Sequence, residues 1–411
     1  MKSLIFSLIL SLFAVHTTVA GKIKITVQAG NYERTDCVVS ADVSSLKKDL
    51  PVTLYETTGK QKRRIPCQLV REEGKTPRVY WILDGKTNAG AVRTFTVESR
   101  KQPENTPAMT VEDNSQVVVL KKNGKRILQY NHAHVEPPAG VNKSYGKSGF
   151  IHPAWSPDGN ILTTIQPKDH YHHYGIWNPW TKIMYDGKVY DLWNLAGKQG
   201  AVKSRNVEAT YDGDVFAGCT ANLEHRIFTP DSEKVIMNEQ WKIKAWNVSD
   251  GFLWDFESHL YPCTSLPVLL KEYRYAGFGY RATNEWTKEN CEMFTSEGKT
   301  RQQIDGTTAR WIYITGNTRT GRSGLLFMGH PDNYNAPEPL RIWDENANGG
   351  RGDAFINFAP TKNKDWELMP DSRYLLRYRI LSYEGEMTKE HADRLWNDFA
   401  SPPVVITDSN R

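Results

Sequence analysis

Short segments of alternating apolar and polar residues run through most of this 411-residue chain, and this alternation constrains the fold more than any other feature. Successive side chains of a β-strand point to opposite faces of its sheet, so such segments fit strands with one buried and one solvent-facing side. In the first hundred residues, turn pairs such as Asp84-Gly85 separate the expected strands. These strands are 22–27, 52–55, 79–83 and 92–97.

The same alternation resumes after residue 107. The dipeptide Asn123-Gly124 predicts a tight hairpin between strands 115–120 and 126–130. Further expected strands are 207–211, 216–228, 235–246, 252–261, 311–315 and 374–383.

A helical pattern occurs only near the C-terminal end. Thr388 can cap a helix there. The apolar residues that fall on one face of this helix are Ala392, Leu395, Trp396 and Phe399. Many strands and few helices predict a mainly β protein: a small N-terminal β-sandwich module, a large antiparallel sandwich of two extended, curved sheets, and a short C-terminal helix.

The first twenty residues predict an export signal. Lys2 forms a short basic region, an apolar run follows, and Thr18-Val19-Ala20 offers small residues for cleavage before Gly21. The polar, proline-containing stretch 100–107 predicts a domain boundary. We therefore expect a signal peptide at 1–20, an N-terminal β module at 21–100, and a large catalytic or sugar-binding domain at 108–402. The compact signal favours the periplasm of a Gram-negative bacterium.

Charge and composition disfavour several classes of function. The formal net charge is +5, with acidic and basic residues interspersed, which argues against nucleic-acid binding. After the signal, no stretch is long and apolar enough for stable membrane insertion. The five cysteines form no Cys-x-x-Cys pair, which disfavours a structural zinc site.

The most distinctive local pattern is the segment Asp-His-Tyr-His-His-Tyr-Gly-Ile-Trp that begins at Asp169. As a strand it would place His170 and His172 on one face, and Asp169 and His173 on the other. Imidazole titrates near neutral pH, so we predict that His172 and His173 are catalytic acid–base groups. Asp169 and Glu257 are the predicted catalytic carboxylates.

Two other interpretations of the histidines stay open. On a strand, His170 and His172 could present two imidazoles to a divalent metal. A third ligand would then come from elsewhere, such as His152, Glu257, His259 or His330. The histidines could also only brace a loop. We favour metal-free proton transfer and assign neither a metal ligand nor a cofactor.

The residues near the histidines favour a sugar ligand. An indole such as that of Trp177 can stack on the C–H face of a sugar ring, while polar side chains bond its hydroxyl groups. The predicted substrate-binding residues are His152, His170, Trp177, Arg281, His330 and Asn333. We interpret Arg351-Gly352-Asp353 as a chance tripeptide in a glycine-rich loop.

Four motifs in a fixed order support a resemblance to a known family. They are His152-Pro153-x-x-Ser156-Pro157-x-Gly159, Asp169-His170-x-His172-His173-x-Gly175-Ile176-Trp177, Gly277-x-Gly279-Tyr280-Arg281 and His330-Pro331-x-Asn333. Together they resemble the PmoA family of exported bacterial proteins. The resemblance implies a galactose-mutarotase-like β-supersandwich, a fold shared by epimerases, lyases and hydrolases of sugars, and a place among polysaccharide-degrading proteins. The family's name points to methane oxidation, but this sequence lacks the transmembrane helices of a copper membrane oxygenase.

The sequence thus predicts a periplasmic carbohydrate-active protein. We expect an enzyme that acts on a glycan or oligosaccharide by His/carboxylate acid–base chemistry, as a lyase, epimerase or hydrolase in polysaccharide utilisation. Retaining hydrolysis fits less well because it usually needs two carboxylates. The alternatives are a non-catalytic sugar-binding protein and a metal-dependent enzyme that uses the His-x-His pair. The expected partner is a carbohydrate substrate.

Overall fold

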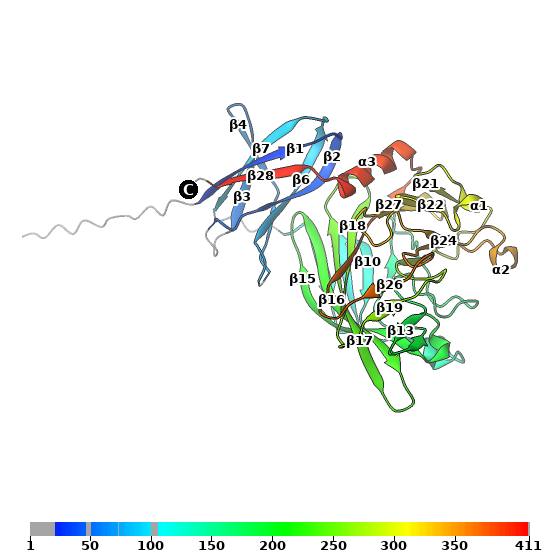
Figure 1. The fold of residues 1–411 in the computed structure, drawn as a ribbon. Coiled ribbons are helices and arrows are strands. Elements are labelled where there is room, and N and C mark those ends of the chain that lie inside the picture. Colours follow the sequence, from blue (N-terminus) through cyan, green and yellow to red (C-terminus); the bar gives the residue numbers. More distant parts are fainter. Residues whose placement is uncertain (1–20, 47–50, 73, 100–105, 410–411) are drawn as a thin grey trace, which may run out of the picture.

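The computed structural model describes residues 21–46, 51–72, 74–99 and 106–409, and its fold is mainly β (Figure 1). A small β module, large antiparallel sheets and a short C-terminal helix are all present, as the sequence predicts. The predicted signal peptide and most of the predicted domain boundary lie outside the described residues. No helix of the described ranges is long and apolar enough to cross a bilayer.

The N-terminal module packs a five-stranded sheet against a three-stranded sheet. The larger sheet, in the order β28-β1-β7-β3-β4, consists of β1 (Lys22–Gln28), β3 (Val52–Thr58), β4 (Gln61–Ile65), β7 (Val92–Ser99) and β28 (Val404–Ser409). The smaller sheet consists of β2 (Arg34–Asp42), β5 (Gln68–Val70) and β6 (Arg78–Thr87). Apolar side chains such as Ile25, Trp81 and Phe95 fill the space between the sheets. Strand β28 pairs antiparallel with β1, so the chain returns to its first module beyond the expected end of the large domain (Figure 1).

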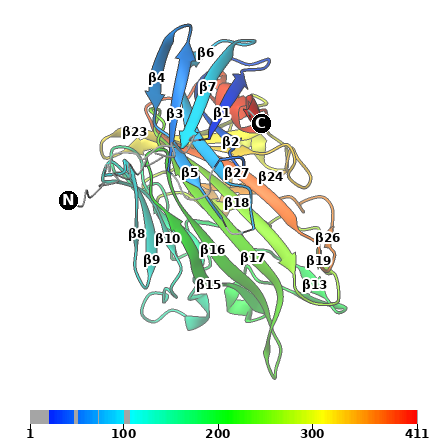
Figure 2. The ribbon, with the colours of Figure 1, turned by 90° about the vertical axis from the view of Figure 1, so that its left-hand side faces the viewer.

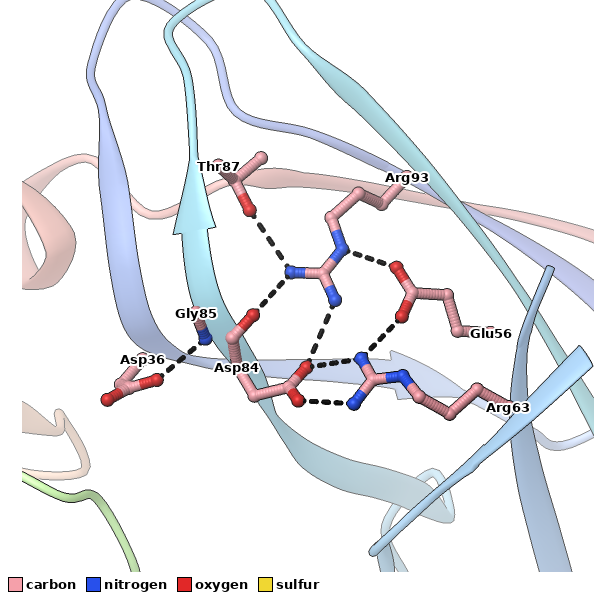
Figure 3. Close-up of polar contacts among 7 residues, drawn as sticks. All are labelled: Asp36, Glu56, Arg63, Asp84, Gly85, Thr87 and Arg93. Carbon is pink, nitrogen blue, oxygen red and sulfur yellow. Dashed lines mark hydrogen bonds and ion pairs between the residues drawn. The ribbon is translucent and has the colours of Figure 1, made fainter. Parts of the chain in front are cut away.

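Ion pairs tie the strands of this module together (Figure 3). Arg93 donates to Glu56 at 2.6 Å and to Oδ1 of Asp84 at 3.0 Å. Arg63 binds the other oxygen of Glu56 at 2.6 Å and both oxygens of Asp84 at 2.6 and 2.8 Å. Each carboxylate therefore bridges two guanidinium groups. The pKa values of both carboxyls lie below the ordinary value, because hydrogen bonds from the two arginines outweigh the opposing effect of burial.

Two eight-stranded antiparallel sheets form the large sandwich. The β12 sheet, in the order β24-β25-β20-β12-β11-β10-β9-β8, consists of β8 (Met109–Asp113), β9 (Val117–Lys122), β10 (Lys125–Asn131), β11 (Phe150–Ala154), β12 (Ile176–Trp177), β20 (Gly279–Arg281), β24 (Leu340–Ile342) and β25 (Phe355–Phe358). The β17 sheet, in the order β15-β16-β17-β18-β27-β23-β22-β21, consists of β15 (Gly200–Tyr211), β16 (Phe216–Phe228), β17 (Glu233–Trp246), β18 (Phe252–Pro262), β21 (Cys291–Thr295), β22 (Trp311–Thr318), β23 (Gly321–Gly329) and β27 (Tyr374–Glu384).

Smaller elements complete the large domain. A four-stranded sheet, in the order β14-β13-β19-β26, consists of β13 (Ile183–Tyr185), β14 (Lys188–Tyr190), β19 (Val268–Leu270) and β26 (Trp366–Leu368). The helical segments are α1 (Arg301–Ile304), α2 (Ala347–Gly350), α3 (Lys389–Ala400) and two 3-10 turns, Lys143–Tyr145 and Leu195–Gly197.

Alternation along the strands of the β12 sheet decides which side chains face the core. Ile176 and Ile356 enter the main core between the two sheets. Their neighbours Trp177 and Phe355 belong to a separate aromatic cluster on the outer face of the sheet. This outer cluster is the base on which the candidate site is built.

Two local predictions are confirmed. Asn123 and Gly124 both have positive φ, at 48° and 79°, in the turn of the hairpin between β9 and β10. Thr388 caps α3, because its hydroxyl oxygen accepts a hydrogen bond from the backbone N–H of His391 at 3.2 Å.

Helix α3 also contacts the N-terminal module through a buried ion pair, in which Arg34 lies 2.9 Å from Asp398.

Candidate functional site

The histidine segment forms two successive turns, and our expectation of a strand is wrong. The backbone N–H of His170 donates to the carbonyl of Pro167, and the N–H of His173 donates to the carbonyl of His170, both at 2.9 Å. Strand alternation therefore does not separate the histidines. The His173 ring centroid lies 4.8 Å from those of His170 and His172, which are themselves 5.4 Å apart.

Gly175 allows the segment to approach strand β11 closely. Its φ is +59°, and a Cβ atom at this position would lie 2.4 Å from the carbonyl oxygen of Ile151. Only glycine fits both the backbone conformation and this approach. The chain then enters β12, where Ile176 pairs with Ile151 and fixes the histidines above the outer face of the sheet.

His173 lies inside an aromatic cage. Its ring centroid is 5.2 Å from those of Trp177 and Phe355 and 5.3 Å from that of Trp343. The residue is 1% exposed, and its Nδ1 atom has no hydrogen-bond partner among the described residues. Burial, followed by the proximity of His172 and Arg281, lowers the pKa of His173 far below the ordinary value. This imidazole is therefore uncharged at neutral pH.

His170 stands at the solvent-facing rim and pairs with a carboxylate. Its side chain is 24% exposed, and its Nδ1 atom is hydrogen-bonded to Oδ2 of Asp169. Burial opposes ionisation of Asp169, but the bond to His170 and the charge of Arg281 outweigh it and lower the pKa of this carboxyl. Asp169 is therefore ionised and can orient the His170 ring.

Two arginines and a second aspartate surround this pair. Arg351 lies 2.7 Å from both Asp169 and Asp353. Arg281 lies 3.7 Å from Asp169 and 3.5 Å from Asp353, and its guanidinium carbon is 4.9 Å from the ring centroid of Trp343. Arg281 is 2% exposed, and its Nη1 atom has no partner among the described residues. The interpretation of Arg351-Gly352-Asp353 as a chance tripeptide is thus corrected, because the fold brings both of its charged residues to the site.

His172 lies on the other side of the rim, beside two tyrosines. Its ring stacks on Tyr145 with a centroid distance of 6.5 Å, and Tyr145 in turn lies 5.6 Å from Tyr171. Burial is the main reason that the pKa of His172 falls to about 4, and the nearby His170 adds to the shift. The two tyrosines are partly exposed and offer flat faces next to the histidines.

Two predicted residues lie beneath or beside the site rather than in it. Trp177 is 1% exposed and is covered by His173 and Trp193, so in this structure it offers no free face to a sugar. His152 bonds Thr163 through its Nδ1 atom at 2.8 Å, and its backbone carbonyl accepts from Asn131 at 2.6 Å. Burial lowers the pKa of His152 to about 4.

Glu257 lies on the opposite side of the sandwich. The prediction that it acts together with the histidines as a catalytic carboxylate is therefore corrected. Its neighbours Phe256 and Ser258 are buried on the inner face of the β17 sheet, and alternation points Glu257 outward. There it contacts His259 at 3.0 Å. Both sheets and the core separate Glu257 from His170.

His330 also belongs to another place, because it lines a cavity of about 240 Å³ next to α3, and Asn333 lies beside that cavity through its bond to Glu338. Asn333 donates to Glu338 at 2.9 Å, and Tyr378 donates to the other oxygen of Glu338 at 2.6 Å. Burial raises the pKa of Glu338 to about 7, although both hydrogen bonds oppose the shift. Glu338 was not predicted from the sequence, although the flanking Pro337 and Pro339 indicate an unusual loop.

Among the described residues, no group of three or more histidine, cysteine, aspartate and glutamate side chains is arranged to hold a metal ion.

Comparison with known proteins matches residues 117–397 to one family model, described as a family of unknown function, DUF6807. No curated protein matches the chain. Among solved structures, the chain is similar to a glycosyl hydrolase family 38 protein from Enterococcus faecalis, with 8% identity and a TM-score of 0.47 over 97% of this chain and 48% of that one. It is also similar to an alpha-mannosidase from E. faecalis V583, with 8% identity and a TM-score of 0.46 over 95% and 46%.

A third similar structure is a galactose mutarotase-like protein from Lactobacillus casei, with 10% identity and a TM-score of 0.34 over 67% of this chain and 100% of that one. The chain spans about half the length of the two E. faecalis structures. At these low TM-scores the likenesses carry no functional argument. The matching model is DUF6807 and not the PmoA family, so that resemblance stays a prediction. Because the match extends over more than half of the chain, the protein belongs to the DUF6807 family of unknown function.

Proposed function

We propose that this protein is an exported carbohydrate-active enzyme that removes a proton next to the carboxylate of a uronate-containing oligosaccharide, as a lyase or an epimerase. The observation that carries the proposal is the hydrogen-bonded pair of Asp169 and His170 at the rim, directly beside Arg281. The Nη1 atom of Arg281 is buried without a partner. A buried N–H without an acceptor is costly, and a ligand oxygen would satisfy it.

In this proposal His170, and not His172 or His173, transfers the proton. Asp169 orients its ring, as a carboxylate does for a general base. His172 and His173 remain uncharged because burial lowers their pKa values, so they add no positive charge that would compete with the arginines.

The chemistry balances without a further reactant. His170 takes the proton from the carbon next to the carboxylate, and the electron pair moves onto the carboxylate oxygens, where Arg281 and Arg351 offset the charge. In a lyase, a carbon–carbon double bond then forms as the bond to the oxygen on the neighbouring carbon breaks, and this oxygen leaves with the proton that His170 has taken. In an epimerase, a proton from water adds to the opposite face of the same carbon, and His170 releases its proton to water.

The remaining expectations belong to the same proposal. Residues 1–20 would direct export to the periplasm, 21–100 would form a separate module, and 108–402 would be the catalytic domain. The resemblance of the histidine motif to the PmoA family supports a role in polysaccharide utilisation.

The experiment incubates the purified protein with uronate-containing oligosaccharides and with their carboxyl-reduced counterparts. A lyase generates a conjugated double bond that absorbs ultraviolet light, and an epimerase incorporates deuterium from heavy water at the acidic carbon without cleavage. His170→Ala should lower either rate by about 10²–10⁴-fold. His259→Ala, on the outer face of the β17 sheet, is the matched control and should leave the rate unchanged.

Turnover of the reduced sugars at the same rate would contradict the proposal, as would full activity of His170→Ala. Tight binding of the acidic sugars without turnover or exchange would instead favour a sugar-binding protein.

A further inference from the structure

A groove lies on the outer face of the β17 sheet, away from the outer face of the β12 sheet that carries the histidine segment. It has a volume of about 700 Å³, within the range of roughly 300–1,000 Å³ that ligand sites occupy. Strands β15 to β18 form its floor, and the segment between β5 and β6 of the N-terminal module forms one wall. Figure 2 looks onto this face, with the green strands of the sheet running below the blue module.

Positive charge dominates the described lining of this groove. The cationic side chains are Arg71, Lys75, Arg205, Lys242 and Arg373. Two acidic side chains, Glu72 and Glu208, face them. A third acid of the lining, Glu239, does not contribute here, because it is 1% exposed and its carboxylate is bonded to His225 in the core. The excess of cations indicates an anionic ligand.

Lys75, Arg205, Lys242 and Arg373 share few acidic partners among the described residues. Lys75 and Lys242 both contact Glu72, the latter at 3.7 Å. Burial, followed by the proximity of Lys75, lowers the pKa of Lys242, so a bound anion would relieve crowding between like charges. Arg205 is 66% exposed, and its nearest acid, Glu224, is 3.9 Å away.

Arg373 forms no ion pair with any described residue and lies over the ring of Tyr261, with its guanidinium carbon 5.3 Å from the ring centroid. An arginine held on an aromatic ring keeps its edge free to donate to a carboxylate or sulfate. Tyr261 also lines the groove and brings an aromatic surface to it.

Uncharged amides cover the floor between these charges. The side-chain amides of Asn222 and Gln240 both donate to the Glu208 carboxylate, at 3.0 and 2.9 Å. The Gln240 amide also donates to the side-chain oxygen Oδ1 of Asn222 at 3.2 Å. Asn238 lies on the same strand as Gln240, two residues earlier, and therefore on the same face. Amides both donate and accept, as recognition of hydroxyl groups requires.

We propose that this groove binds an acidic glycan, a polyhydroxylated chain that bears carboxylate or sulfate groups. The cationic side chains would bind the acidic groups, and the amides between them would bind the hydroxyls. This site is separate from the Asp169–His170 pair, and the inference does not depend on the proposed catalytic function.

The test measures binding of oligogalacturonate to the full mature chain by calorimetry, next to the same oligomer with its carboxylates methyl-esterified. A carrageenan-derived oligosaccharide, which bears sulfate but no carboxylate, distinguishes sulfate from carboxylate as the recognised group, and single-stranded DNA of similar length serves as a general polyanion. We expect an acidic oligosaccharide to bind at least tenfold more tightly than the ester and the DNA, with affinity that falls as salt rises.

The variant Arg205→Gln/Arg373→Gln should weaken this binding about tenfold or more and leave the melting temperature unchanged, because neither side chain holds a close ion pair. Lys188→Gln/Arg319→Gln removes the same charge from exposed positions outside the groove and should bind like the unaltered protein. His170→Ala should also bind normally, which separates this site from the catalytic one. Equal binding of ester and acid, equal binding of DNA, no binding, or full affinity in the groove variant would each overturn the inference.

Discussion

Nη2 of Arg351 lies 2.7 Å from Oδ2 of Asp169, although 182 residues separate the two in sequence. The contact holds the loop after α2 against the turn that carries His170. The same aspartate oxygen is bonded to the His170 ring. One carboxylate thus orients the imidazole and anchors the guanidinium, which makes Asp169 the residue that organises the rim.

Asp169→Asn should therefore impair catalysis while leaving the fold intact. The amide cannot offset the charge of Arg281 and Arg351, and it holds the His170 ring less well, so we expect kcat on a uronate substrate to fall by about 10²-fold or more. Asp365→Asn is the control, because Asp365 pairs with Lys271 at 2.9 Å away from the site. Steady-state kinetics and melting temperatures of both variants check the prediction, and equal kcat in the two would contradict it.

Glu338→Gln should stabilise the protein at high pH and not at low pH. Burial raises the pKa of Glu338 from the ordinary 4.5 to about 7, so the folded state holds a proton that the unfolded chain releases. The contribution of this carboxyl group to the free energy of unfolding is fully present below pH 4.5, and it is lost as the pH rises to about 7. The glutamine can keep bonds to both Asn333 and Tyr378. A pKa that rises from 4.5 to about 7 corresponds to about 3 kcal/mol, so we expect the free energy of unfolding of the variant in urea to rise by up to this amount at pH 8 and to change little at pH 4. A constant difference across pH would contradict this.

The buried histidines should make the protein sensitive to acid. The pKa values of His152 and His172 are lowered to about 4, mainly by burial, whereas in the unfolded chain they stay near 6.5. Between pH 6.5 and 4 the unfolded state binds more protons, so stability falls as the pH drops through this window. In the variant His152→Gln, the free energy of unfolding should fall by up to about 3 kcal/mol less between pH 6.5 and pH 4 than in the unaltered protein. Unfolding curves at several pH values measure the slope, and an unchanged slope in the variant would show that His152 titrates normally.

Much of the fold could be predicted because alternation is visible along single strands. The long strands β16 and β17 and the capped helix α3 follow from local pattern alone. The local structure of the candidate site was harder to predict. The density of histidines indicated a functional segment, but Pro167 and Gly175 on either side of it are typical of turns, and the prediction of a strand did not take them into account.

Contacts across the sandwich could not be predicted from one sequence. Alternation along β18 places Glu257 and His259 on one face of the strand, but nothing local says that this face is the outer side of the other sheet. Trp343 and Arg351 reach the histidines only because β24 and β25 lie beside β20 and β12. Such neighbours are set by the order of strands in the sheet.

In the N-terminal module, two arginines in one network should differ in their effect on stability (Figure 3). The Arg93 side chain is 16% exposed and that of Arg63 is 54% exposed, although both bind Glu56 and Asp84. Arg93→Met should cost about 1.5–3 kcal/mol, because it leaves partly buried groups unpaired. Arg63→Met should cost less than about 1 kcal/mol, as exposed ion pairs do. Chemical unfolding of the two variants compares them, and a larger loss for Arg63→Met would refute the ranking by burial.

The glycine after the histidine turn should tolerate no side chain. In Gly175→Ala the new Cβ atom would meet the Ile151 carbonyl oxygen at 2.4 Å in a backbone with φ of +59°, so either the turn or strand β11 must move. Gly159→Ala provides the matched control, because Gly159 also has positive φ, +85°, but nothing lies within 4 Å of its added Cβ. We expect the free energy of unfolding to fall by about 1 kcal/mol in the control, where only the backbone is strained, and by clearly more in Gly175→Ala.

The displaced turn should also change the tryptophan fluorescence, because Trp343 and Trp177 lie near His173. Equal losses and unchanged fluorescence in both variants would mean that close approach to β11 does not position the histidines.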